Sequence, residues 1–211
     1  MSLRAQPWRR SSIGSGSRVQ RRWCLAAPRS PCSSGRMLAK DSVCEWLFFG
    51  PNSDEATGTY FTPFVEAARE ARACGALPSN PIFTLRTRDG GEFVGQCGLL
   101  AIDASPGAYL IGYQIDDSCW NRGYGTEACG FLVYYAFLVA GAYRLNGDCA
   151  AGNTGSRRVM ERCGFVAEGC QRKYWHARGG FHDRLLFGLL ADDLDAARRH
   201  SLAASFAANP G

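Results

Sequence analysis

Short apolar runs separated by turn signals organise the middle of the chain. Three of them follow one another at residues 82–88, 92–102 and 108–115, with Asp-Gly-Gly and Ser-Pro-Gly turns between them. Runs of this length, bounded by Gly, Pro and Asp, predict β-strands, and a tight turn returns each strand beside its predecessor. We therefore predict an antiparallel meander.

The second half of the chain alternates helical and strand-like segments. Helices are expected at 123–140 and 153–162, and the apolar stretch in the first is too short for a membrane span and is typical of a buried core helix. A strand is expected at 144–150, and a final hairpin at 165–176 and 181–190. This order predicts a mixed α/β (α+β) fold in three layers, with a mostly antiparallel central sheet flanked by helices.

Two helices are expected before the meander. The first runs from Asp41 to Phe48 and ends at a Gly-Pro pair. The second is predicted to begin with Thr62 as its N-cap and Pro63 at its first helical position, and to end at Ala73.

The two ends of the chain differ from this body. Residues 1–36 hold eight arginines and no Asp or Glu, and they show no hydrophobic period. We interpret them as a disordered tail or a mis-assigned start, with a targeting peptide as the third alternative. The globular domain is expected over residues 37–194, followed by a C-terminal tail at 195–211.

Charge and cysteine content narrow the possible functions. Outside residues 1–36 the chain has sixteen basic and nineteen acidic residues, so it lacks the basic surface typical of nucleic-acid binding. The ten cysteines form no C-x-x-C pair and do not combine with the three histidines at zinc-finger spacing. We therefore expect no metal site, no nucleic-acid or membrane partner, and free thiols in a reducing compartment.

The most informative segment joins a predicted strand to a predicted helix, and its centre is Arg122-Gly123-Tyr124-Gly125-Thr126. A helix start offers unpaired backbone N–H groups and the positive end of the helix dipole, and glycines let an anion approach them. Phosphate or pyrophosphate is the expected guest. The Walker A string is absent, and the dinucleotide fingerprint fails because its third glycine is replaced by Ala128.

The string from Trp120 to Ala128 resembles the cofactor pyrophosphate loop of GNAT acetyltransferases, and within them the branch of ribosomal-protein N-terminal acetyltransferases. Two further blocks fit in order, Asn153 to Ser156 and Gly179 to Asp183. The resemblance covers about Ala39 to Leu194. It implies an acetyltransferase domain over 37–194, acetyl-CoA as co-substrate, a cytoplasmic location, and a monomer or homodimer.

The resemblance also assigns roles by position. The strand from Tyr113 to Asp116 would offer backbone groups to the pantetheine arm of acetyl-CoA. Asn153 would contact the cofactor near its reactive end, and Ser156 would protonate the departing thiolate. The implied cofactor-binding residues are Tyr113, Ile115, Asp116, Asn121, Arg122, Gly123, Tyr124, Gly125, Thr126, Asn153 and Ser156.

Two departures from the family pattern leave the acid and base groups open. Met160 stands where many members carry a tyrosine acid, so Ser156 is the expected proton donor. Trp175 stands where some relatives carry a glutamate base. Our candidate base is Glu168, and the alternatives are Asp183 and His182.

The family's first strand has no clear counterpart, since residues 1–36 contain no alternating segment before the helix near Leu38. Either this strand is unrecognisable or it is missing, and its loss would expose a sheet edge. The branch forms its acceptor cleft where this chain has Trp46, Phe48, Phe49, Tyr60, Phe61 and Phe64. Most of these predict core packing, and those that line the cleft would favour an uncharged or partly apolar acceptor.

The resulting hypothesis is an N-acetyltransferase that moves acetyl from acetyl-CoA to a primary amine, either a protein N-terminus or a small molecule. A thioester is already activated, so the enzyme must position the amine, remove a proton and stabilise an oxyanion. The alternatives are a non-catalytic acyl-CoA-binding module, because the usual Tyr and Glu are missing, and a nucleotide-binding regulator using the same loop.

Overall fold

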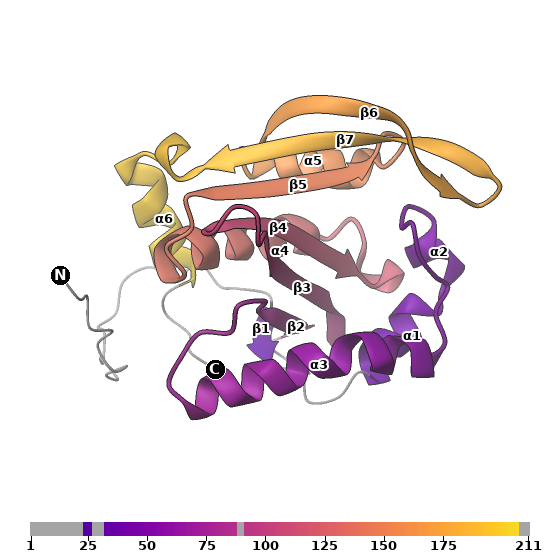
Figure 1. Cartoon of the computed structure of the whole chain (residues 1–211), viewed down its shortest axis with the longest axis horizontal. Helices are drawn as coiled ribbons and strands as arrows, with labels where there is room; N and C mark the ends of the chain where they lie inside the picture. The colour runs from indigo at the N-terminus through magenta and orange to yellow at the C-terminus, as the bar shows by residue number, and fades with distance from the viewer. Residues whose placement is uncertain (1–22, 27–31, 88–90, 207–211) are drawn as a thin grey trace.

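A computed structural model of the chain describes residues 23–26, 32–87 and 91–206, and the structural statements below concern these ranges. Seven strands form one sheet between layers of helices, which confirms the predicted mixed fold (Figure 1).

The sheet has the strand order β1-β2-β3-β4-β5-β7-β6. Neighbouring strands are antiparallel except β4 and β5, which run parallel. The predicted meander is β2-β3-β4, and the predicted final hairpin is β6-β7. The strands are β1 (Trp23–Ala26), β2 (Ile82–Thr87), β3 (Phe93–Ala101), β4 (Ala108–Ile115), β5 (Arg144–Ala150), β6 (Val166–Ala177) and β7 (Gly180–Leu190).

Strand β1 is the element that the sequence did not reveal. All four of its residues pair with β2, from Trp23 opposite Thr87 to Ala26 opposite Thr84. Four residues are too few to show an alternating pattern. The first strand is therefore present but unrecognisable, and the interpretation of 1–36 as a tail is corrected for this stretch. Residues 1–22 and 27–31 lie outside the described part.

The helices lie on both faces of the sheet, with α1 and α3 on one side and α4 and α5 on the other (Figure 1). Beneath α4, Leu99, Leu132 and Leu145 are fully buried in the main core. A smaller cluster around Met37 and Leu38 holds α1. The helices are α1 (Cys32–Leu38), α2 (Asp41–Cys44), α3 (Asp54–Ala73), α4 (Tyr124–Tyr134, continued by a π-helical turn Tyr135–Val139), α5 (Thr154–Arg162) and α6 (Ala196–Phe206).

Helix α3 begins nine residues before its predicted start, with Ser53 and not Thr62 as its N-cap. The Ser53 hydroxyl accepts a hydrogen bond from the Ala56 N–H at 3.1 Å, and Asp54 and Glu55 follow in the first turn. This cap and these charges stabilise a helix start more than a proline does. Pro63 therefore lies inside the helix, where it removes one backbone hydrogen bond. Helix α2 is also shorter than predicted, because it ends at Cys44.

The limits of the domain stay a prediction, but elements cross both of them. Helix α1 begins at Cys32, before the predicted limit at residue 37, and α6 follows the limit at 194. The Phe206 ring lies 5.8 Å from the ring centroids of both Phe131 and Tyr134 on α4. Helix α6 thus packs against the core of the same domain.

Replacing Phe206 by Ala should therefore destabilise the whole domain. We expect a loss of about 2 kcal/mol in the free energy of unfolding, less than for a fully buried Phe because this ring is only partly covered. Urea unfolding measures it, with Phe181→Ala as control, because Phe181 is 63% exposed. Equal stability of both variants would mean that α6 is an appendage and not part of the domain.

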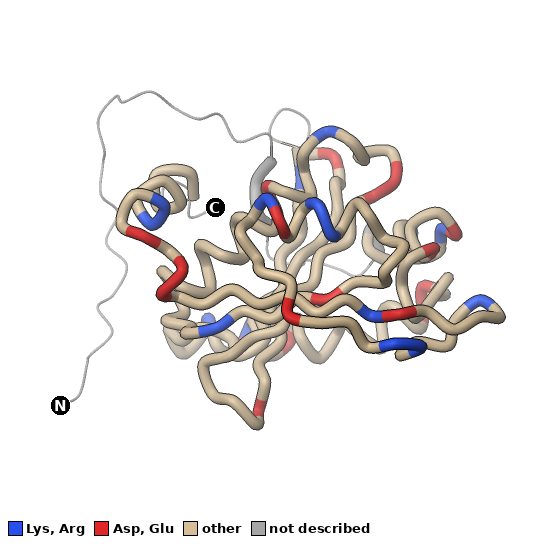
Figure 2. Tube along the Cα trace, turned by 90° about the horizontal axis from the view of Figure 1, so that it is seen from above, with Lys and Arg blue, Asp and Glu red and all other residues tan. Residues whose placement is uncertain are grey.

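Surface charge is mixed over the described residues. Lys and Arg alternate with Asp and Glu along the trace and leave no face of a single sign (Figure 2). No described helix is long and apolar enough to cross a membrane. Within the same residues, no group of three or more His, Cys, Asp or Glu side chains is placed to hold a metal ion, and the eight cysteines from Cys44 to Cys170 are free thiols.

Candidate active site

The site begins where β4 and β5 separate. These parallel strands pair only over their first three residues, Ala108–Leu110 with Arg144–Asn146. From Ile111 onward β4 keeps β3 as its partner but no longer pairs with β5. The β4 backbone groups on that side have no strand partner, so they can bind an extended ligand lying between the two strands.

The gap between β4 and β5 from Ile111 onward is the split, and the predicted anion loop, residues 121–126, lies at its end. Asn121 and Gly123 have φ values of 60° and 86°, which turn the chain sharply into α4. The helical ladder begins with the Glu127 N–H, which donates to the Gly123 carbonyl at 3.1 Å, so the N–H groups of residues 124–126 have no partner within the helix. No atom lies within 4 Å of a Cβ built on Gly123. The structure therefore leaves room for an anion on these amides, as predicted.

The other predicted loop residues divide between this anion site and the core. A Cβ on Gly125 would lie 3.4 Å from Val159 of α5, so this glycine lies where α4 packs on α5. The Tyr124 side chain is buried in the main core. Arg122 is exposed beside the loop.

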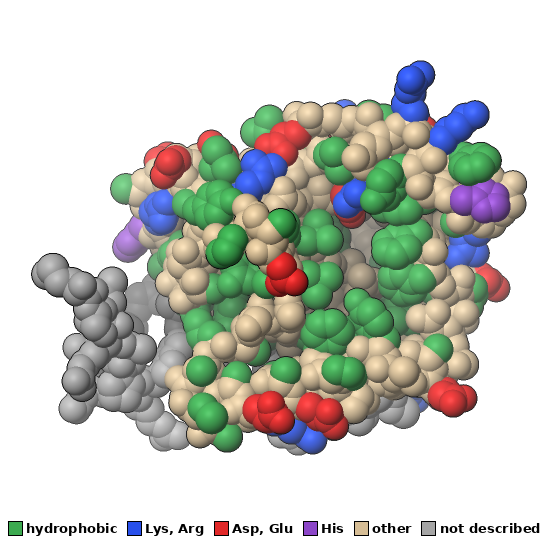
Figure 3. All heavy atoms as spheres, in the orientation of Figure 1, with side chains coloured by type: hydrophobic (Ala, Val, Ile, Leu, Met, Phe, Trp, Pro, Cys, Tyr) green, Lys and Arg blue, Asp and Glu red, His purple; other side chains and the backbone are tan. Residues whose placement is uncertain are grey.

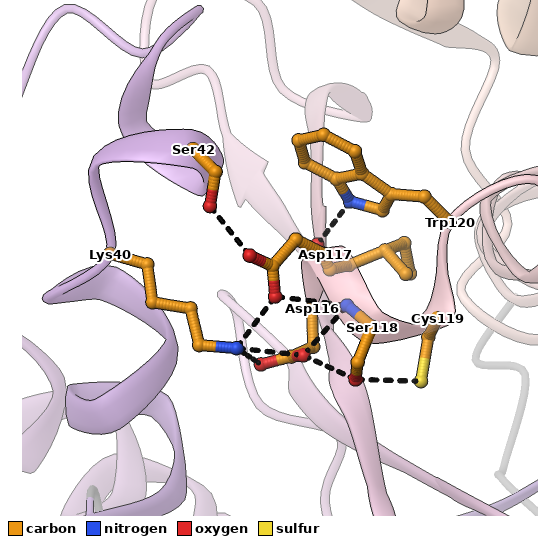
Figure 4. A network of polar contacts seen from close by, with 8 residues as sticks. Lys40, Ser42, Asp116, Asp117, Ser118, Cys119 and Trp120 are labelled. Atoms are coloured by element: carbon orange, nitrogen blue, oxygen red, sulfur yellow. Dashed lines mark hydrogen bonds and ion pairs between the residues drawn. The ribbon is translucent and has the colours of Figure 1, made fainter.

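A polar cluster fastens the loop to the α1–α2 junction (Figure 4). Lys40 donates to both oxygens of Asp116 at 2.9 and 3.0 Å, and to Asp117 at 2.6 Å. The Ser42 hydroxyl donates to the second oxygen of Asp117 at 2.6 Å, and the Trp120 indole N–H donates to the Ile115 carbonyl at 2.7 Å. The Asp116 side chain is thus occupied by Lys40. Its backbone N–H donates to the Val94 carbonyl at 2.9 Å and its carbonyl accepts from the Cys119 N–H at 2.8 Å, so Asp116 fastens the loop, against the predicted ligand contact.

Because of this cluster, the free energy of unfolding should depend on pH in the acid range. Hydrogen bonds from Lys40 and then Ser42 lower the pKa of Asp117 to about 2 from its ordinary 3.8. The ionised carboxylate therefore stabilises the fold fully above pH 3.8, and this stabilisation is lost as pH falls through 2. We expect Asp117→Asn to lower the unfolding free energy by at most ~1 kcal/mol at pH 7, and this deficit should shrink as pH falls through 3.8 and vanish only well below pH 2. Urea unfolding across this range measures it. Asp103→Asn, in the exposed β3–β4 turn, should show no such trend, and a constant deficit in Asp117→Asn would contradict the prediction.

The predicted proton donor lies at the other side of the split. Asn153 caps α5, with its side-chain oxygen accepting from the Ser156 N–H at 2.9 Å. The Ser156 hydroxyl lies 2.9 Å from the Tyr113 hydroxyl of β4, so the two hydroxyls bridge the separated strands. Burial raises the pKa of Tyr113 well above its ordinary value, and it raises the pKa of the neighbouring Cys149 thiol to about 11. All three groups therefore keep their protons at neutral pH.

Glu168 does not join this group, against the prediction. Glu168 lies in a bulge of β6 and forms an ion pair with Arg144, at the start of β5. Ser156 lies beyond the end of β5, so the two residues are at opposite ends of this strand. Asp183 accepts from the Lys173 N–H at 2.7 Å, and His182 lies 3.2 Å from the Ala177 carbonyl. Both alternatives therefore shape the β6–β7 hairpin. Sequence could not show this, because the bulges set which strand residues face one another.

The segment after α2 lies across the ends of the split. The Trp46 ring covers the loop before α5 so closely that a Cβ on Gly152 would lie 2.5 Å from it. Phe48 stacks on Trp175 of β6, with ring centroids 5.5 Å apart, and Arg178 of the hairpin donates to the Cys44 carbonyl. Hydrophobic side chains surround a hollow on this face of the molecule (Figure 3). Of the six aromatic residues predicted for core or cleft, Phe48 is 61% exposed, whereas Phe49 and Phe61 pack on the smaller core.

Comparison with known proteins identifies the arrangement. The family model described as acetyltransferase (GNAT) domain matches residues 33–166. YdaF of Bacillus subtilis, named as a ribosomal N-acetyltransferase, is 30% identical over 69% of this chain and 76% of its own length. The uncharacterized N-acetyltransferase p20 of Bacillus licheniformis is 31% identical over 51% of this chain and 61% of its own length.

Solved structures share the fold. RimJ of Mycobacterium smegmatis, in complex with CoA-disulfide, superposes with a TM-score of 0.66 at 23% identity, covering 87% of this chain and 88% of that one. Spermidine N-acetyltransferase from Vibrio cholerae, in complex with CoA and spermine, also gives 0.66, at 15% identity over 81% of this chain and 96% of that one. By its family model and its relatives, this chain belongs to the GNAT acetyltransferase family and is an N-acetyltransferase.

Proposed function

We propose that this chain transfers the acetyl group of acetyl-CoA to a primary amine by direct attack of the amine on the thioester. The observation that carries the proposal is the position of the split. It runs from free helix N–H groups at one end, at residues 124–126, to the paired hydroxyls of Tyr113 and Ser156. A ligand with a pyrophosphate, an extended amide arm and a reactive sulfur matches this sequence of features.

The residues present fit acetyl-CoA. The open space at Gly123 and the amides of 124–126 would hold the pyrophosphate, assisted by the N–H groups from Asn121 onward and the charge of Arg122. The backbone of Tyr113 and the N–H of Ile115 would bind the pantetheine amides as a strand would, whereas the Ile115 carbonyl and the Asp116 backbone are already bonded within the protein. When bound, the thioester supplies an activated acetyl group.

Direct attack is favoured over an acetylated cysteine. Cys149 is the thiol beside Ser156, and its pKa of about 11 leaves almost no thiolate at pH 7. A protonated thiol is a poor nucleophile, so the acceptor amine must reach the thioester itself. The Ser156 hydroxyl would give a proton to the leaving sulfur.

The acceptor class rests on the relatives and on the hollow. YdaF is named for ribosomal acetylation, and the Vibrio cholerae protein was crystallised with spermine. Ribosomal proteins and spermine both carry primary amines. The exposed Phe48 favours an acceptor with an apolar part beside its amine. We therefore propose a protein N-terminus or a small-molecule amine.

Acetyl-CoA consumption with a panel of amines tests the function. The panel contains an alanine-initiated peptide, a serine-initiated peptide, spermine and phenethylamine, each read by release of free CoA thiol. At least one should be acetylated on nitrogen, as judged by mass spectrometry. Tight acetyl-CoA binding with no acetylation would favour the alternative, a non-catalytic acyl-CoA-binding module. That alternative is motivated by Met160 and Trp175 at the usual acid and base positions.

A further inference from the structure

One face of β5 carries a charged pair beside the split. Successive side chains of a strand point to opposite faces, so Leu145, Gly147 and Cys149 face α4 and α5, where Leu145 is fully buried. Asn146 and Asp148 therefore point to the other face. Apolar residues on that face, such as Val166 and Leu190, remain 61% and 39% exposed, so the face is open to an incoming molecule.

Asp148 is held by Arg184 of β7 through one of its oxygens. The guanidinium donates from Nε to Oδ2 at 2.7 Å and from Nη2 to the same oxygen. Its remaining nitrogen lies 3.3 Å from Gln171, and the group stacks 4.6 Å from the centroid of the Tyr174 ring. Arg184 is thus fixed, and Asp148 Oδ1 receives none of these bonds. Both side chains are 19% exposed, so the ion pair is partly open to solvent.

The position of Asp148 relates it to the reacting atoms. Asn146 is the last β5 residue paired with β4, and Asp148 is the next residue on the same face, about 7 Å farther along the split. Its neighbour Cys149 contacts the Ser156 hydroxyl on the opposite face. The proton donor for sulfur and this carboxylate therefore border the same opening from its two sides.

We propose that Asp148 binds the ammonium group of the acceptor through Oδ1 and takes its first proton. This inference rests on the proposed function and supplies the base that Glu168, Asp183 and His182 do not. The ammonium loses one proton to Asp148, which passes it to water. The neutral amine then forms the C–N bond while the C–S bond breaks, and the second nitrogen proton replaces the one that Ser156 gives to the sulfur. The products are the amide, the free thiol and one released proton.

The test is Asp148→Asn assayed with the alanine-initiated peptide, and with spermine if the panel selects it. At pH 7 we expect kcat/KM to fall at least about tenfold, while the dissociation constant of acetyl-CoA is unchanged. The deficit should shrink as pH rises toward the pKa of the amine itself, because a neutral amine needs no base. Calorimetric titration of the same amine into the CoA-bound chain should show weaker binding in the variant.

Two further variants distinguish a role of Asp148 in proton transfer from a role in holding Arg184. Asp148→Asn leaves Arg184 unpaired, so the double variant Asp148→Asn/Arg184→Gln removes that charge and should stay impaired. Glu168→Gln breaks the Arg144 ion pair on the same face and should leave both readouts unchanged. Recovery in the double variant, or a wild-type pH profile in Asp148→Asn, overturns the role of Asp148. A wild-type chain that acetylates no amine overturns the proposed function instead.

Discussion

Gly123→Asp should abolish the binding of acetyl-CoA. The substitution puts a carboxylate at the helix start where the pyrophosphate is proposed to lie, and it forces a side chain into a backbone with φ of 86°. Loss of two charge-assisted hydrogen bonds costs about 3–6 kcal/mol, which is at least about a hundredfold in the dissociation constant. Calorimetric titration of acetyl-CoA into the purified chain measures this directly.

A matched control isolates the anion site from backbone strain. Gly141 also has a positive φ, 68°, and open space around it, but it lies at the other end of the α4 helix, about 25 Å away. Gly141→Asp should therefore carry a similar strain and bind acetyl-CoA like the wild type. If both variants bind equally well, the pyrophosphate does not lie on the α4 amides, and if both fail, the loss comes from misfolding.

The fold could be predicted wherever local signals were strong. The bounds of β4 and β5 are those predicted, because turn residues punctuate the chain on both sides of each strand. The helix predicted at 153–162 is α5, which begins one residue later because Asn153 is its N-cap. The start of α3 was missed because Pro63 was taken as a beginning, although Ser53 and the acidic residues after it form the stronger cap. Strand β1 has too few residues to carry a pattern, and only its pairing with β2 defines it.

The site was predictable where it is built from backbone. The proposed anion loop depends on glycine and on a helix start, which are both local, so the sequence alone could suggest it. Side-chain partners are set by tertiary structure instead. Lys40 is 76 residues from Asp116, and Tyr113 is 43 residues from Ser156. Asp148 was not a candidate, because its relation to the split depends on where β4 and β5 stop pairing.

The α1–α2 region connects the two halves of the site. Lys40 fastens it to the anion loop, Trp46 covers the loop before α5, and Phe48 stacks on Trp175 of the hairpin. In the proposed function, these contacts would place the exposed Phe48 ring beside the opening that receives the cofactor arm. A segment held at three points would then respond to both ligands, so we expect cofactor and acceptor binding to influence one another.

Removing the hydroxyls that bridge the split should slow the chemical step. We expect Ser156→Ala to lower kcat about a hundredfold and Tyr113→Phe about tenfold, with the acetyl-CoA dissociation constant unchanged in both. Ser156 touches the leaving sulfur in the proposed function, whereas Tyr113 acts through Ser156 by holding its hydroxyl at 2.9 Å. Because the two form one chain of hydrogen bonds, the double variant should be no slower than Ser156→Ala.

The ionisation of bound CoA separates this role from a structural one. A hydroxyl that donates to the sulfur stabilises the thiolate, so the thiol pKa of CoA in the complex, followed by thiolate absorbance, should rise in Ser156→Ala and to a lesser degree in Tyr113→Phe. If the CoA thiol pKa in both variants equals that in the wild type, or if the losses in kcat add up in the double variant, the hydroxyl pair only ties β4 to α5. Proton donation to sulfur would then have to come from water in the split.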